Sequence, residues 1–295
     1  MFKLKFLTRV LLVLLFFSSF IMTSCDKNIL GTAAVYEKGG EYTNYDKVAD
    51  KIKDSDIILF GELHNNAFAH WAELELTKLM YKEIGNKLMI GMEMFEADDQ
   101  MLIDEYFNDL YPTNNFEDEA KIWKNYSTDY KPILEFCKKN KIEFVATNVP
   151  RRYAAFVSRN GLEKLSTLSP EALKYIAPLP VEFDSTLKGY KEMKGMPVHN
   201  KDIKYLAEAQ AVKDATMAHF IAKRIKSGMK FLHFHGSYHS NDYQGIYWYL
   251  KKQNPNFKIT TIATIEGPKI DSLGTENANI ADFILLIRDD FTKTY

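Results

Sequence analysis

Cysteine is scarce in this sequence: only Cys25 and Cys137 occur among its 295 residues. Cys25 falls in a motif that predicts its modification, as described below, so we expect no intrachain disulfide. Cys137 lies in a helical pattern that begins at Pro132, whereas an activated thiol needs a cationic or helix-N-terminal setting. We therefore expect Cys137 to be a small buried hydrophobe and not a nucleophile.

The sequence also lacks an excess of positive or negative charge. The sequence has 38 Lys and Arg against 39 Asp and Glu, which gives a formal net charge of −1. A protein that binds nucleic acid normally shows a basic patch or a strongly basic balance. We therefore expect no nucleic-acid partner. Aromatic residues are plentiful, with 20 Phe and 17 Tyr, and a surplus of tyrosine suits a flat aromatic ligand as well as a core.

The apolar run near the N-terminus, Val10–Met22, is too short to span a bilayer comfortably. It follows a positively charged segment and has the length of the apolar part of a signal peptide. The run leads into Thr23-Ser24-Cys25, which resembles the lipobox of bacterial lipoproteins, where the cysteine becomes the acylated first residue. We predict a signal peptide over residues 1–24 and a lipid on Cys25 that anchors the protein to a bacterial membrane in the cell envelope. An uncleaved membrane anchor is the alternative.

Short apolar runs alternate with helical patterns along the rest of the chain. This alternation predicts an α/β fold of three layers, with a mostly parallel central sheet flanked by helices on both faces. Residues 25–44 are small and polar, with Gly39-Gly40, and are predicted to form a flexible tether before a domain over 45–295. Residues 161–197 are predicted to be a helical insertion or lid. The expected strands are Ile57–Phe60, Lys87–Met94, Lys141–Thr147, Phe231–His235, Ile259–Ile265 and Phe283–Ile287.

Polar side chains gather where the predicted strands end. Two strands lead into the same pattern, Gly-x-x-His, at Gly61–His64 and at Gly236–His239. Ligands of open α/β sheets bind outside the carboxyl ends of the strands. Glu93 lies inside an apolar strand, where a carboxylate is costly to bury unless it is paired or ligates something. We therefore predict an active or binding centre that contains Glu62, His64, Glu93 and His239.

These residue types allow three kinds of chemistry. Two carboxylates and two imidazoles could ligate Zn, Mn or Fe, and an open ligand position would then activate water. Without a metal, a histidine held by a glutamate could act as a general base. A haem pocket is the third possibility, because His or Tyr can reach the iron while aromatic and methionine side chains line the plane. The spacing alone leaves these three alternatives open.

Three further residues are weighed against the site, and two of them have two interpretations each. Arg151 follows a strand end and could meet carboxylates or propionates, although a solvated pair with Arg152 is equally consistent with the sequence. Asp214 shares a helix face with Gln210, so it either caps another element or reaches the site. His70 is expected to be solvated or locally bonded.

Several motifs, in a fixed order, resemble those of one known family. The set is similar to the ChaN-like haem-binding uptake lipoproteins of the Tiki/TraB superfamily. The motifs are Phe60-Gly61-Glu62-Leu63-His64, Gly91-Met92-Glu93-Met94-Phe95 with Gln100, Tyr130-Lys131-Pro132-Ile133-Leu134, Ala146-Thr147-Asn148-Val149-Pro150-Arg151, Gln210-x-x-x-Asp214-x-x-Met217-Ala218 and Gly236-x-x-His239.

The resemblance implies a fold of the erythromycin-esterase/ChaN kind and haem as the cofactor, shared by a homodimer. It implies haem-site residues His64, Glu93, Tyr130, Arg151, Gln210, Asp214, Tyr238 and His239. Tyr130 is the first candidate for the iron ligand and Tyr238 the second. We therefore expect a membrane-anchored lipoprotein that binds haem for haem and iron uptake.

The same superfamily implies a rival function. Tiki and TraB relatives carry two Gly-x-x-His motifs and glutamates, and are regarded as metal-dependent peptidases. On that interpretation Glu62, His64, Glu93 and His239 are the catalytic and metal-binding set of a hydrolase that uses Zn or Mn. Whether the protein is an enzyme stays open from the sequence.

Overall fold

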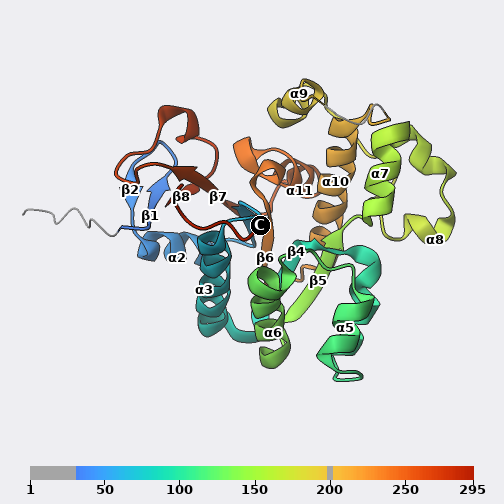
Figure 1. Ribbon diagram of the computed structural model, residues 1–295, viewed down its shortest axis with the longest axis horizontal. Coiled ribbons are helices and arrows are strands. Elements are labelled where there is room, and N and C mark those ends of the chain that lie inside the picture. Colours follow the sequence, from blue (N-terminus) through green and yellow to red (C-terminus); the bar gives the residue numbers. More distant parts are fainter. Residues whose placement is uncertain (1–30, 198–201) are drawn as a thin grey trace, which may run out of the picture. The chain divides into compact units, whose positions relative to one another are not determined.

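A sheet of eight strands organises the fold (Figure 1). In the computed structural model, which describes residues 31–197 and 202–295, the strand order is β2-β1-β8-β7-β3-β6-β4-β5. The six strands from β8 to β5 pair in parallel, and β1 pairs antiparallel with both β2 and β8. The strands are β1 Ala33–Glu37, β2 Tyr42–Thr43, β3 Ile57–Glu62, β4 Leu88–Glu96, β5 Glu143–Asn148, β6 Lys230–Gly236, β7 Ile259–Gly267 and β8 Phe283–Arg288.

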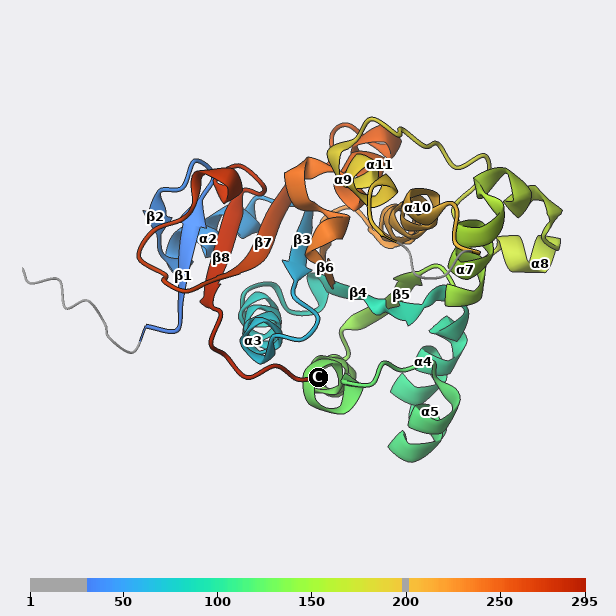
Figure 2. The ribbon, with the colours of Figure 1, turned by 45° about the horizontal axis from the view of Figure 1, so that its top comes forward.

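Helices cover both faces of this sheet, as Figure 2 shows for α10 and α11 on one face and α3 on the other. The helices are α2 Tyr45–Lys53, α3 Ala67–Ile84, α4 Gln100–Phe107, α5 Thr113–Glu119, α6 Lys131–Asn140, α7 Arg151–Asn160, α8 Pro170–Leu173, α9 Lys188–Lys194, α10 Leu206–Arg224 and α11 Ile246–Gln253. A single π-helical turn, η3, spans Tyr126–Tyr130 just before α6.

Two apolar cores follow from the alternation of side chains along the strands. Ile58 and Phe60 of β3 point into a core shared with α2, α3, α4 and α6. Their neighbours Ile57 and Leu59 point into the opposite core, against α10 and α11. Because both faces of β3 are covered, the strand is apolar from Ile57 to Phe60, as expected for the centre of a parallel sheet. The predicted three-layer α/β fold is confirmed.

The predicted tether is wrong for residues that the structure describes. Ala33–Glu37 and Tyr42–Thr43 form a hairpin, and β1 pairs with β8 along its whole length. Gly39 and Gly40, which have φ of 96° and 86°, make the turn. Paired glycines are a hairpin signal as well as a tether signal, because only glycine adopts positive φ readily. The predicted signal peptide, Cys25 and the first part of the tether lie outside the described residues.

The predicted helical insertion, residues 161–197, contains short helices and no strand. It holds the 3₁₀ segment Leu162–Thr167, α8 and α9. Tyr190 and Met193 of α9 pack on Ala207 and Ala211 of α10. In the part of the chain that the structure describes, no helix is both long and apolar enough to cross a bilayer.

The register of the central strands decides where the polar groups meet. In the parallel pair of β3 and β6, Glu62 lies opposite Gly236. On the other side of β6, β4 runs in parallel up to Met92, opposite Phe234. The pairing of β4 with β5 then shifts register between Met92 and Glu96. Such a bulge re-aims side chains, and Glu93 lies within it.

Candidate functional site

The carboxyl ends of β3, β6 and β4 bring the two Gly-x-x-His segments together with Glu93. His239 Nε2 lies 3.1 Å from Glu93 Oε1, and His64 Nε2 lies 3.9 Å from Glu93 Oε2. His64 Nδ1 lies 2.6 Å from Glu62 Oε1, on the other side of the ring. The four predicted residues therefore form a chain, Glu62–His64–Glu93–His239, and not a shell around one point.

Glu93 is a buried carboxylate. It is 3% exposed and accepts a hydrogen bond from the backbone N–H of Gly236 at 2.9 Å. Burial alone would raise the pKa of Glu93, but the charge and hydrogen bond of His239 hold it well below its usual range. Glu93 is therefore ionised at neutral pH.

His239 lies between two carboxylates. Its Nδ1 contacts Asp214 Oδ1 and its Nε2 contacts Glu93. Burial lowers the pKa of His239, but the two carboxylates outweigh burial and raise it to about 9. A histidine that is protonated at neutral pH is an ion-paired cation, so His239 is poorly suited to act as a general base.

Asp214 and Gln210 of α10 support His239. Asp214 is fully buried and accepts a hydrogen bond from the Tyr190 hydroxyl at 2.7 Å. Gln210 Nε2 lies 3.0 Å from His239 Nδ1. Burial raises the pKa of Asp214 against the opposing effect of His239. Of the two interpretations that the sequence allows for Asp214, reaching the site is the one that the geometry supports, because its carboxylate contacts His239.

His64 is the more open of the two motif histidines, with 33% of its side chain exposed. Its ring meets Trp123 edge-on, with the ring centroids 5.0 Å apart. Burial lowers the pKa of His64, but the hydrogen bond to Glu62 and the charge of Glu93 give a net rise. Gly236 permits this position, because a Cβ there would lie 2.6 Å from His64 Nε2.

A second polar cluster lies beside Glu62, away from Glu93. His70 is 4% exposed, not solvated, and its Nδ1 lies 2.7 Å from Glu62 Oε2. Burial lowers the pKa of His70, but Glu62 and Glu73 raise it to about 11. Burial and the charge of Glu62 raise the pKa of Glu73 to about 8.

Tyr130, the first candidate for an iron ligand, belongs to this cluster. Its side chain is fully buried and its hydroxyl donates to Glu62 Oε1 at 3.0 Å. Burial raises the pKa of Tyr130 far above its usual value. This position does not favour Tyr130 as a ligand of haem iron.

The two remaining histidines of β6, His233 and His235, are core residues. Both are fully buried, and their Nδ1 atoms lie 3.0 Å apart. Burial lowers the pKa of His235 to about 3 and lowers that of His233 as well. Both rings are therefore neutral and packed behind the site.

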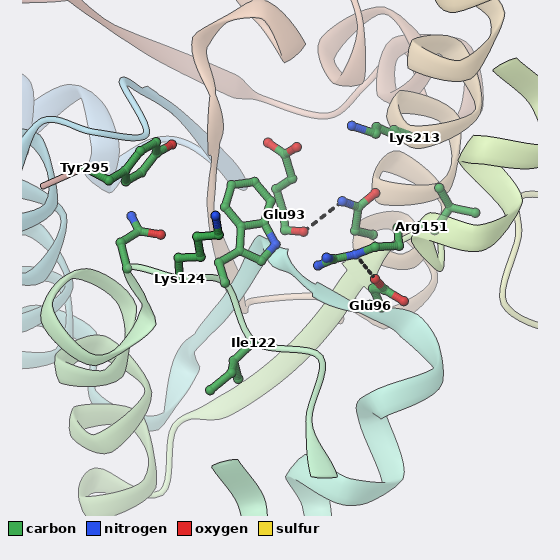
Figure 3. A pocket seen from close by; sticks show the side chains of 11 residues that line it. Glu93, Glu96, Ile122, Lys124, Arg151, Lys213 and Tyr295 are labelled. Carbon is green, nitrogen blue, oxygen red and sulfur yellow. Dashed lines mark hydrogen bonds and ion pairs between the residues drawn. The ribbon is translucent and has the colours of Figure 1, made fainter. Parts of the chain in front are cut away.

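An open hollow of about 380 Å³ lies over Glu93 (Figure 3). Three cationic side chains, two aromatic rings and two carboxylates border it: Lys124, Arg151, Lys213, Trp123, Tyr295, Glu93 and Glu96. Arg151 comes from the start of α7 and pairs with Glu96 at 2.9 Å. Tyr238 borders a separate hollow with Tyr190 and Gln244, so the second candidate for an iron ligand lies apart from Glu93.

Sequence reasoning did not assign several residues of this hollow to the site. Trp123, Lys124, Lys213 and Tyr295 come from a loop, α10 and the C-terminal segment. None stands in a motif, and the fold alone brings them beside Arg151. An abundance of aromatic residues was the only signal available in the sequence.

Comparisons with known proteins agree with one another. Residues 48–250 match the sequence model of the family described as haem-binding uptake, Tiki superfamily, ChaN. A solved structure described as cofacial heme binding to ChaN of Campylobacter jejuni has a TM-score of 0.66 and 18% identity. It covers 88% of this chain and 98% of its own, a likeness that shows the fold.

A curated relative is the chloroplastic Protein RETICULATA-RELATED 5 of Arabidopsis thaliana. It is 22% identical over 196 residues, which is 62% of this chain and 26% of the relative. The chain therefore spans about a quarter of that relative's length.

Proposed function

This chain belongs to the ChaN family of the Tiki superfamily, whose description is haem-binding uptake, and from that membership we propose that it binds haem at the hollow over Glu93 and serves haem and iron uptake. The hollow is the observation that carries the proposal. Haem joins a flat apolar ring system to two anionic propionates, and the hollow presents aromatic rings together with cationic side chains.

The residues on the border of the hollow suit the two parts of haem. Trp123 and Ile122 offer apolar surface for the ring system. Arg151 and Lys213 offer donors for charge-assisted hydrogen bonds to the propionates. Arg151 is 63% exposed, so it keeps donors free beyond its pair with Glu96. A volume of about 380 Å³ falls in the range of small-molecule sites.

Tyr295 is the proposed iron ligand. Tyrosine is one of the side chains that ligate haem iron, and Tyr295 borders the hollow with 65% of its surface exposed. Tyr130 is buried on Glu62, and Tyr238 borders another hollow. His64 stands against Trp123 and is the second candidate.

Location and assembly complete the proposal. A lipid on Cys25 would hold the protein at a bacterial membrane in the cell envelope, where it could meet haem. The Campylobacter jejuni relative is described as binding heme cofacially. We extend that arrangement to this chain as a homodimer in which two hollows face each other and share bound haem. An open hollow at the surface is compatible with such a contact.

A haemin titration of the full-length chain in detergent tests the proposal, with detergent alone as the blank. We expect a saturable shift of the Soret band at about one haem per chain. Sedimentation should show the mass of two chains when haem is bound. Tyr295→Phe should shift the Soret band or weaken binding at least about 10-fold, whereas Tyr238→Phe, its matched control in the other hollow, should behave as the unaltered chain.

The possible results separate the parts of the proposal. Absence of a saturable shift beyond the detergent blank would disprove haem binding at this hollow. A normal shift with the mass of one chain would remove only the dimer. An effect of Tyr238→Phe in place of Tyr295→Phe would move the iron ligand to the other hollow.

A further inference from the structure

Glu62, His70, Glu73 and Asp129 form a buried cluster between the end of β3, α3 and η3. The exposed fraction of each is 4% or less. Within residues 31–197 and 202–295, these three carboxylates form ion pairs only with His64 and His70. A buried carboxylate without a matched cation is strongly destabilising. The cluster therefore holds three carboxyl groups against one buried imidazole and the ring of His64, and the raised pKa of Glu73 reflects this excess of carboxyl groups.

Three donor atoms of this cluster already converge. His70 Nδ1 lies 2.7 Å from Glu62 Oε2 and 3.3 Å from Glu73 Oε2. One ligand atom from each residue lies within 4.8 Å of the other two. Bonds of about 2.0–2.2 Å separate two ligands of a tetrahedral ion by about 3.4 Å, so small side-chain adjustments suffice. His70 and Glu73 are three residues apart on α3 and share one face of that helix.

One carboxylate oxygen in the cluster has no hydrogen-bond donor. Glu73 Oε1 is buried and unpaired, whereas Glu62 Oε2 faces His70 Nδ1 at 2.7 Å. Glu62 Oε1, in contrast, accepts from the Tyr130 hydroxyl and contacts His64 Nδ1. An unpaired oxygen of a buried carboxylate carries the full cost of desolvation. A cation beside His70 Nδ1 would meet the carboxyl groups of both Glu62 and Glu73.

The other nitrogen of His70 has the partners that are typical of a metal ligand. His70 Nε2 lies 3.3 Å from Asp129 Oδ2 and 3.2 Å from the backbone oxygen of His64. Asn125 Nδ2 donates to Asp129 Oδ2 at 2.7 Å and holds that carboxylate in place. A ligating histidine usually donates its second N–H to a carboxylate or a carbonyl, which frees the first nitrogen for the ion.

We propose that Glu62, His70 and Glu73 bind one divalent transition-metal ion. One imidazole nitrogen and carboxylate oxygens suit Zn²⁺, Mn²⁺ or Fe²⁺. A surface hollow of about 420 Å³ reaches two residues of the cluster, His70 and Asp129. The site shares only Glu62 with the metal set predicted from the sequence.

The consequence for the protein is a structural link. The ion ties α3 to the end of β3 and fixes Glu62, which in turn holds the ring of His64 at 2.6 Å. His64 packs on Trp123 at the border of the hollow over Glu93. The metal site stands on its own geometry and does not depend on haem binding.

Titration with Co²⁺ tests the site, because bound Co²⁺ absorbs in the visible range and reports its ligands. The full-length chain in detergent is stripped with a chelator, and the absence of a Soret band shows that it is free of haem. We expect one Co²⁺ per chain, displaced by one equivalent of Zn²⁺, together with a rise in melting temperature.

Variants identify the ligands. Glu73→Gln removes a ligating carboxylate at nearly constant size and should weaken Co²⁺ binding at least about 100-fold, while Asp129→Asn, which acts through His70, should weaken it about 10- to 100-fold. Glu75→Gln is the matched control, since Glu75 lies on α3 but pairs at the surface with Lys78. It should bind as the unaltered chain does. Circular dichroism shows whether each variant is folded.

The contrary outcomes are equally definite. If folded Glu73→Gln binds Co²⁺ as tightly as the unaltered chain, the site is wrong. Loss of binding in Glu93→Gln but not in Glu73→Gln would place the ion at the four strand-end residues instead. Weak binding that does not saturate at one ion per chain means an adventitious ion only. A failed haemin titration leaves these results unaffected, so the two proposals fail separately.

Discussion

His64 holds its position because a glycine, Gly236, faces it from the neighbouring strand. Gly236 has ordinary extended torsions, with φ of −57° and ψ of 141°, so its backbone does not require glycine. Space requires it, since a Cβ at Gly236 would lie 2.6 Å from Nε2 and 2.9 Å from Cε1 of His64. The glycine of the second Gly-x-x-His motif is therefore needed so that the histidine of the first motif can pack against the backbone there.

Gly236→Ala tests this close approach. The added methyl should push the His64 ring from its contacts with Glu62 and Trp123, and overpacking of this kind costs about 1–3 kcal/mol of unfolding free energy. The affinity for haemin should also fall, because the His64 ring packs on Trp123 at the border of the hollow. Denaturant unfolding and a haemin titration measure the two effects.

Gly189→Ala is the matched control for that change. Its Cβ would meet nothing closer than Gln244 Oε1 at 3.7 Å, and alanine favours a helix by about 0.5–1 kcal/mol over glycine. Equal stability of Gly236→Ala and the unaltered chain would mean that His64 moves aside at no cost.

Helix α3 connects the strand-end site to the buried cluster, and the side chain of Asn66 caps its N-terminus. Asn66 Oδ1 accepts the N–H of Ala69 at 2.9 Å, and Asn66 Nδ2 donates to Glu266 Oε1. Asparagine is among the preferred N-cap residues for this reason. The first turn of α3 contains no acidic residue, so the cap side chain carries most of the stabilisation there. His70 follows one turn later.

Asn66→Ala should lower the free energy of unfolding by about 1–2 kcal/mol, because it leaves the Ala69 N–H without its acceptor and leaves Glu266 with Lys293 as its partner. Thermal or denaturant unfolding measures the change. We expect Co²⁺ binding at His70 to weaken in the same variant.

Asn44 is the N-cap of α2 and accepts from Lys47 N–H at 3.0 Å on an exposed helix. Asn44→Ala should cost only about 0.5–1 kcal/mol and leave Co²⁺ binding unchanged. If both variants lose the same free energy of unfolding, the buried cap of α3 stabilises the protein no more than the exposed cap of α2 does.

On the scale of the whole molecule, the parallel strand order collects groups that are far apart in the sequence. β6 lies between β3 and β4, so the segments around residues 62, 93 and 236 end at one edge. Helices cover both faces of the sheet, and the hollow bordered by Trp123 and Arg151 opens at that edge. Cys25, the proposed lipid attachment point, lies outside the described residues.

Cys25→Ser tests the proposed lipid anchor in a bacterial host that processes lipoproteins. We expect the altered chain to carry no lipid, as mass spectrometry would show, and to leave the membrane fraction. A serine cannot form the thioether that holds the lipid, so the chain loses its lipid anchor. Cys137→Ala changes the other cysteine, which is fully buried, and should stay with the membrane. A Cys25→Ser chain that remains membrane-bound would indicate an uncleaved apolar anchor.

The sequence by itself determined the layers of the fold and the strand ends that carry polar groups. Alternating runs and helical periods are local patterns, so β3, β4 and β6 could be predicted, together with Glu62, Glu93 and the two motif histidines. The motifs also indicated the family. The hairpin of β1 and β2 was missed because a pair of glycines fits a tether equally well.

Only the tertiary structure decided which of these groups meet. It directed His239 toward Asp214, buried Tyr130 on Glu62, and brought Tyr295 beside Arg151. It also turned His70 into the interior, where Glu62 and Glu73 converge on it. Such contacts depend on strand order and register across the sheet, and periodicity along one segment carries no information about either.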